Sequence, residues 1–232
     1  MVKEKNFAVF EKKIGVKFKN KDLLIQAMVH RSYLNEHPSF GVGHNERLEF
    51  LGDAVLEMVV TEFLYNTYDN PEGELTNWRA SLVNAKMLSV IGADLRLEEY
   101  LFLSRGESKD AGTKARQYIL ANAMEALIGS IYLDRGMRIA SNFIHRFIIT
   151  HLPVILEKEL YRDSKSRFQE AAQEKLGITP TYRVLSETGP DHHKKFLVGI
   201  FLDKEQVATG EGESKQEAQT NAAEAALQVK KW

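Results

Sequence analysis

The stretch His44-Asn45-Glu46-Arg47-Leu48-Glu49-Phe50-Leu51-Gly52-Asp53-Ala54-Val55-Leu56 decides the fold of this chain. A helix turns by about 100° per residue, so one stripe of it collects carboxylates. Its members are Glu46, Glu49, Asp53 and Glu57. The opposite face is apolar, with Leu48, Leu51, Val55, Met58 and Val59. The stretch therefore predicts an amphipathic helix that buries one face and presents oxygen atoms on the other.

A solvated acidic face is the ordinary interpretation of such a stripe, but two details oppose it. Like charges three and four residues apart repel one another and weaken a helix. Gly52 costs about 1 kcal/mol relative to Ala in a helix interior, which indicates that another backbone passes close to it. Phe50 lies on the acidic side, so it either packs under a neighbouring loop or meets another subunit.

A second helix over residues 118–129 supplies a partner for this stripe. Asn122, Glu125 and Gly129 share one of its faces, and apolar residues occupy the other. If the two polar faces converge, the oxygen-bearing side chains form one cluster, made of Glu46, Glu49, Asp53, Asn122 and Glu125. Oxygen ligands of this kind suit Mg²⁺ rather than zinc.

Composition excludes several classes of protein. The 232 residues are 44% apolar and include no cysteine, which excludes disulfides, thiolate nucleophiles and zinc-thiolate sites. The charged N-terminal segment and the lack of an apolar run near the roughly 20 residues of a membrane span favour a cytoplasmic protein. The seven histidines are scattered and form no catalytic arrangement.

The organisation of the chain changes near residue 160. Helical periodicity continues to about residue 158, interrupted by loops at 37–43, 68–73 and 104–113. After a charged segment (157–166) come a helix over 167–177, three β-compatible segments and a last helix that Ser214 can cap. We therefore expect a first domain over 1–156, a linker over 157–163 and a second domain over 164–232.

These residues resemble a known family. Asn45 to Ala54 is similar to the signature of ribonuclease III, and His30-Arg31-Ser32, Arg79-Ala80-Ser81-Leu82-Val83 and Glu125-Ala126-Leu127-Ile128-Gly129 resemble further blocks in the same order. The unit after residue 164 is similar to a double-stranded-RNA-binding domain. Together these resemblances cover nearly the whole chain.

The resemblance implies an all-α endonuclease domain followed by an α-β-β-β-α domain. It implies a homodimer that cuts double-stranded RNA, leaves short 3′ overhangs, and processes structured ribosomal and messenger RNA precursors. The implied cofactor is Mg²⁺, with Mn²⁺ as a possible substitute. The implied metal ligands are Glu49, Asp53, Asn122 and Glu125. Asp53 and Glu125 would be catalytic, Glu46 and Glu72 would assist, and Phe50 would plug into the partner subunit.

The second domain implies contacts with RNA. Its first helix would meet a minor groove through Ser166, Gln169 and Glu170, and His192 would reach a second one. Lys194, Lys195 and Lys215 are candidates for phosphate contacts, and the last helix would turn its N-terminus to phosphate. The alternative is a small αβ domain with ordinary surface charges. With ten basic and ten acidic residues from Ser164 onward, this domain is not a basic block.

Asn122 departs from the family, which usually has Asp at this position. An amide oxygen still ligates Mg²⁺, but it brings no charge. The main alternative function is therefore a catalytically impaired protein that binds double-stranded RNA. A helical interaction scaffold unrelated to RNA would leave the carboxylate stripe unexplained.

Overall fold

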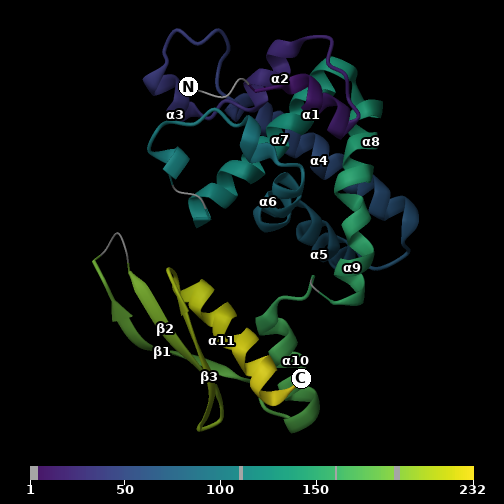
Figure 1. The fold of residues 1–232 in the computed structure, drawn as a ribbon. Coiled ribbons are helices and arrows are strands. Elements are labelled where there is room, and N and C mark those ends of the chain that lie inside the picture. Colours follow the sequence, from purple (N-terminus) through teal and green to yellow (C-terminus); the bar gives the residue numbers. More distant parts are fainter. Residues whose placement is uncertain (1–4, 110–111, 160, 191–193) are drawn as a thin grey trace. The chain divides into compact units, whose positions relative to one another are not determined.

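The structure is a computed structural model that describes residues 5–109, 112–159, 161–190 and 194–232. Its chain forms two compact units, Met1–Tyr161 and Arg162–Trp232 (Figure 1). The first unit is helical, and the second combines helices with an antiparallel sheet. The expected fold class is thereby confirmed, with an all-α unit followed by an α-β-β-β-α unit.

The helices of the first unit follow the apolar periodicity of the sequence. Local capping sets several of their ends: the side chain of Asn20 accepts from the backbone of Asp22, and Thr113 accepts from that of Arg116. In order the helices are α1 (Phe7–Ile14), α2 (Lys21–Ala27), α3 (Arg31–Glu36), α4 (Glu46–Thr67), α5 (Glu72–Val83), α6 (Ala85–Asp94), η1 (Leu97–Tyr100), η2 (Glu107–Lys109), α7 (Lys114–Arg135), α8 (Met137–Phe147), η3 (Ile149–His151) and α9 (Leu152–Glu157).

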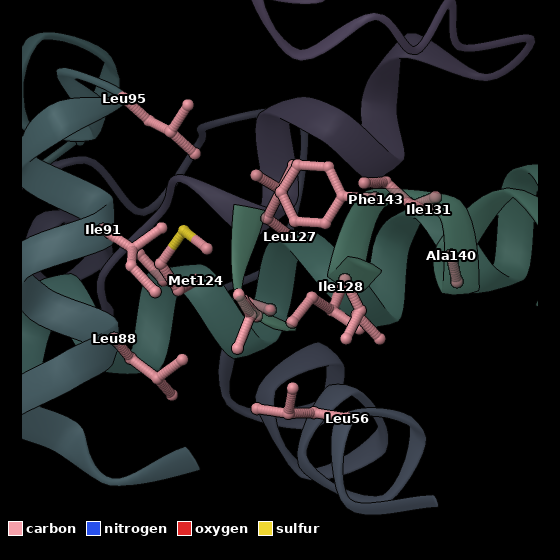
Figure 2. Close-up of a cluster of buried hydrophobic side chains, with 14 of the residues drawn as sticks. Leu56, Leu88, Ile91, Leu95, Met124, Leu127, Ile128, Ile131, Ala140 and Phe143 are labelled. Carbon is pink, nitrogen blue, oxygen red and sulfur yellow. The ribbon is translucent and has the colours of Figure 1, made fainter. Parts of the chain in front are cut away.

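The core of the first unit surrounds α7. Figure 2 shows buried side chains from α4, α6, α7 and α8 meeting there, among them Leu56, Ile91, Met124 and Phe143. Nearly every residue of α7 from Ile119 to Ile131 is buried, apart from Asn122 and Glu125, which are half-buried. The helix that carries the second set of polar candidates is therefore the central helix of its domain.

The apolar face expected for α4 is only partly right. Leu48, Val55 and Val59 are buried, but Met58 is 58% exposed. Leu56 is fully buried instead, although the sequence analysis did not place it in the core. The buried face is rotated towards Gly52, the position at which the backbone of α4 meets that of α7.

One apolar segment contradicts the expectation that no run approaches the length of a membrane span. An 18-residue window within the 21-residue segment Met137–Glu157 has mean hydropathy 1.3, so by length and composition alone this segment is able to cross a membrane. The structure divides it into α8, η3 and α9, and it buries Phe143, Ile148 and Ile155 in the core. Core packing thus accounts for its composition.

The second unit has the predicted order of elements. α10 (Ser164–Leu176) begins three residues earlier than expected, because Asp163 caps it, and ends at Gly177 in the left-handed conformation. The strands β1 (Thr181–Thr188), β2 (Lys195–Leu202) and β3 (Glu205–Gly212) form an antiparallel sheet in the order β1-β2-β3. α11 (Lys215–Lys230) follows, and its alanines share a core with Phe168 and Ile200.

Candidate active site and nucleic-acid interface

Two glycines let α4 and α7 cross with their backbones in contact. A Cβ atom added at Gly52 would lie 1.7 Å from the carbonyl oxygen of Glu125. One added at Gly129 would lie 2.2 Å from the carbonyl oxygen of Leu48. No side chain fits at either position, so the expectation that another backbone approaches Gly52 is confirmed. The same role for Gly129 was not expected from the sequence.

This crossing brings Glu49 and Asp53 of α4 beside Glu125 of α7. Burial raises the pKa of Glu125 to about 7, with further contributions from the charges of Asp53 and then Glu49. The pKa of Glu49 is also raised, by burial and then by Glu46 and Asp53. The polar faces of the two helices therefore converge, as the sequence analysis hypothesised. Three carboxylates repel one another at the centre of this cluster.

Glu46 lies at the edge of the cluster, near positive charge. Its Oε1 is 3.5 Å from Nη1 of Arg31, and its Oε2 is 3.7 Å from Nδ1 of His44. Sequence reasoning identified the block that contains Arg31 but assigned no role to that residue. Glu57, on the same stripe, is directed to Arg79, whose Nε lies 3.3 Å from Oε2 of Glu57.

Asn122 is half-buried, three residues before Glu125 on α7. Residues at this spacing are neighbours on a helix surface, so Asn122 shares the face of α7 that carries Glu125. The amide adds an oxygen donor without adding to the repulsion.

The donor chemistry of the cluster fits a hard divalent cation such as Mg²⁺. A cation between the carboxylates would relieve the repulsion that, with burial, raises the pKa of Glu125. In the part of the chain that the structure describes, however, no three His, Asp or Glu side chains are close enough to hold a metal ion. The side chains are therefore of the right kind but are not closed around a metal site in this conformation.

Without divalent cations, Glu125→Gln is expected to raise the Tm at pH 8 and to change it little at pH 5. The folded-state pKa of about 7 lies above the ordinary 4.5. The folded protein therefore retains a proton between these values and loses stability as the pH rises through 7. The Gln amide removes this loss. Because the carboxylate is partly open to solvent, the expected gain is only ~2–4 °C, about 1 kcal/mol.

Thermal unfolding in EDTA at the two pH values measures this effect. Glu62→Gln, at an exposed position of α4, is the matched control. A gain that is equal at both pH values, or that the control reproduces, would show that repulsion at Glu125 is not its cause.

Glu72 lies apart from this cluster. It is exposed at the start of α5 and lines a hollow of about 750 Å³. The other lining residues come from the second half of α4, from α5 and from the segment that joins these two helices; among them are Tyr65, Leu75 and Arg79. A single copy of the chain does not bring Glu72 to the carboxylate cluster. Its assisting role stays a prediction.

Phe50 is 82% exposed, which excludes the alternative that it packs under a neighbouring loop. It belongs to an exposed apolar stripe along α4, which also includes Met58 and Tyr65. Tyr65 borders the hollow that Glu72 lines. A large aromatic ring held in water on a rigid helix is typical of a protein–protein contact.

The RNA-contact candidates of the second unit lie on its surface. Ser166, Gln169 and Glu170 are exposed on α10, although Glu170 lies 3.7 Å from Arg162. Lys195 is exposed at the start of β2, and Lys194 before it is half-buried. His192 lies outside the described residues.

Lys215, the remaining candidate, is paired within the protein. Its Nζ lies 3.0 Å from Oε1 of Glu187 on β1. The N-terminus of α11 also carries a carboxylate, because Glu217 accepts a hydrogen bond from the backbone N–H of Glu213. From the sequence, both features were expected to face phosphate, and neither of these partners was expected.

Comparison with known proteins finds a matching family model for each of the two units. A family model described as ribonuclease-III-like matches residues 20–152, and a double-stranded RNA binding motif matches residues 164–230. The chain is 41% identical to Ribonuclease 3 of Carboxydothermus hydrogenoformans, over 98% of this chain and 97% of the relative. It is also 41% identical to Ribonuclease 3 of Wolinella succinogenes, over 95% and 90%.

A solved structure is similar to the first unit. It is the nuclease domain of ribonuclease III from Campylobacter jejuni, described for structural flexibility in a region involved in dimer formation. The TM-score is 0.57 at 38% identity, covering 64% of this chain and 99% of that one.

Proposed function

Because the chain belongs to the ribonuclease III family, as its sequence indicated, we propose that it cleaves double-stranded RNA by metal-assisted hydrolysis of internal phosphodiester bonds. Family membership and the double-stranded RNA binding motif together support endonuclease activity on double-stranded RNA. The observation that supports the chemistry is the convergence of Glu49, Asp53 and Glu125 at the glycine crossing.

The residues of the cluster have distinct roles in this proposal. Glu49, Asp53 and Glu125 would hold the cation, and the amide oxygen of Asn122 would complete the set of ligands. A bound divalent cation supplies a water made nucleophilic at neutral pH and stabilises the leaving 3′-oxygen. Glu125 has a pKa of about 7 before a cation binds, so it must release its proton to act as a ligand. Glu46 is held by Arg31 at the edge of the cluster, where it is able to assist with substrate.

The proposed working unit is a homodimer. Its support is the exposed apolar stripe of α4, because water contact is unfavourable for side chains as large as Phe50 and Tyr65. Two copies would bring one carboxylate cluster each to a bound duplex and cut opposite strands, leaving short 3′ overhangs. Structured ribosomal and messenger RNA precursors are the proposed substrates.

One observation favours a second function, binding of double-stranded RNA with impaired cleavage. Asn122 provides no negative charge where the family usually has Asp, and charge count tunes cation affinity. Glu49, Asp53 and Glu125 keep their juxtaposition, and all three carboxylates would be ionised around a bound cation, so activity remains the main proposal.

A nuclease assay with Mg²⁺ and then Mn²⁺ tests both functions, and Asn122→Asp makes it sharper. We expect wild-type protein to cut a perfectly paired RNA. We expect Asn122→Asp to reach its half-maximal rate at a roughly tenfold lower Mg²⁺ concentration, because the added charge strengthens cation binding. Asn142→Asp, an exposed change on α8, is the control.

The outcomes separate the two functions. Duplex binding without cleavage in either cation would support the impaired alternative, especially if Asn122→Asp restored cutting. Equal Mg²⁺ requirements for the wild type and Asn122→Asp would remove Asn122 from the metal site.

A further inference from the structure

The internal pairing of Lys215 has a consequence for RNA binding. Lys215 is the first residue of α11, and its side chain is 58% exposed. Glu187 projects from β1, one residue before that strand ends, and its carboxylate is 3.0 Å from the ammonium group. The ammonium also lies 5.5 Å from the ring centroid of Phe196, the residue opposite Glu187 in the sheet. Lys215 therefore has an ordered location above the edge of the sheet.

A second carboxylate lies at the N-terminus of α11. The backbone N–H of Glu217 donates to Oγ of Ser214 at 3.1 Å, and the Glu217 carboxylate accepts from the N–H of Glu213 at 2.9 Å. Ser214 thus caps α11, and the Glu217 side chain reaches back to the residue before this cap. This carboxylate places negative charge where the helix dipole would otherwise favour a phosphate.

We propose that Glu187 sets the RNA affinity of this domain by holding Lys215 in an internal ion pair that an RNA phosphate must replace. The inference rests on the proposed binding of double-stranded RNA. The phosphate backbone supplies much of the affinity for nucleic acid through cations. In a domain with ten basic and ten acidic residues, one cation withheld from phosphate is a substantial share of the available contacts.

The pair is weak enough for RNA to displace it. Both side chains are partly exposed, at 58% and 38%, and partly exposed ion pairs contribute little stability. After the exchange, Glu187 would lose its pairing with Lys215, and its charge would repel the phosphate bound nearby. Glu187 thus opposes binding before and after the exchange. Removing its charge is expected to strengthen RNA binding without loss of the fold.

The same domain contains a matched control pair. Nζ of Lys230 lies 3.0 Å from Oε1 of Glu205, at the other end of α11. Glu205→Gln removes the same charge and breaks an ion pair of the same length. It does so far from Lys215, because Lys230 is the last residue of the 16-residue helix that Lys215 begins.

The experiment is a double-mutant cycle on the full chain in EDTA, which prevents cleavage. Binding to one perfectly paired RNA is measured by fluorescence anisotropy at fixed KCl for wild type, Glu187→Gln, Lys215→Gln, the double variant and Glu205→Gln. We expect Glu187→Gln to bind about three- to tenfold tighter, as a released cation and a removed repulsion together imply. Lys215→Gln should bind more weakly, and Glu187→Gln should give a smaller gain in the Lys215→Gln background.

Each other result overturns the inference. Unchanged or weaker binding by Glu187→Gln shows that the pair does not limit affinity. An equal gain from Glu205→Gln, or an undiminished gain without Lys215, indicates a general charge effect. Normal binding by Lys215→Gln removes this lysine from the interface. If wild-type protein failed to bind the duplex at all, the proposed function itself would fall. Thermal unfolding of each variant confirms that the compared proteins are folded.

Discussion

Glu125→Gln is expected to abolish cleavage of double-stranded RNA while leaving RNA binding largely intact. Glu125 is a half-buried carboxylate of the central helix α7, within the electrostatic influence of Asp53 and Glu49. The Gln amide keeps its size but removes a charged metal ligand. Metal-assisted stabilisation of the reacting phosphate amounts to several kcal/mol, so we expect the rate to fall by about a hundredfold or more.

Cleavage and binding should be measured on the same hairpin, by denaturing gel and by gel shift. Glu62→Gln controls for loss of one charge on an exposed part of the nuclease domain. Near-normal cutting by Glu125→Gln would remove Glu125 from the mechanism. Loss of binding together with cutting would point to misfolding instead, which the thermal measurements at pH 8 detect independently.

Phe50→Ala is expected to shift the protein from dimer towards monomer. In the isolated chain, Phe50 has little contact with its own domain, since it is 82% exposed on α4. Its loss should therefore not weaken the folded monomer. An aromatic residue buried at the centre of an interface contributes about 2 kcal/mol or more, equivalent to a dissociation constant raised roughly 30-fold.

Light scattering at low micromolar concentration measures this shift, and Tm measures the integrity of the fold. Val90→Ala is the matched control, because Val90 is an exposed apolar residue of α6, away from the α4 stripe. A variant that remains dimeric would show that Phe50 is outside the interface. A lowered Tm in a protein that is already monomeric would instead indicate local packing.

The order of elements was predictable because the signals for it are local. Apolar periodicity marked α4 and α7, Gly177 marked the end of α10, and Ser214 capped α11. Such signals act over one or two helical turns, so a single sequence contains them. The sequence of helix, three strands and helix after residue 164 followed from the same reasoning.

The buried face of α4 was only partly predictable. A helical wheel ranks faces by polarity, and on α4 it placed Met58 in the core and omitted Leu56. In the structure Met58 is exposed and Leu56 is buried, because α4 lies against the central helix and leaves another apolar stripe uncovered. That stripe carries Phe50, whose direction away from the core the wheel did predict.

The electrostatic partners were beyond sequence reasoning. Glu57 pairs with Arg79, Glu46 with Arg31 and Glu187 with Lys215, and each partner comes from a different element. Long charged side chains pair with whatever the fold brings within a few ångströms, a choice that sequence spacing does not encode.

For the site itself, the sequence determined that Glu49 and Asp53 share a helix face, that Asn122 and Glu125 share another, and that a backbone must pass close to Gly52. It did so because backbone geometry sets the direction of side chains along a helix. Only the tertiary structure decided that the backbone at Gly52 is that of Glu125. The same crossing buries the Glu125 carboxylate beside the other two and raises its pKa to about 7. Burial and mutual repulsion depend on which surfaces meet in space, and α4 and α7, which are separated in the chain by α5 and α6, meet only in the folded protein.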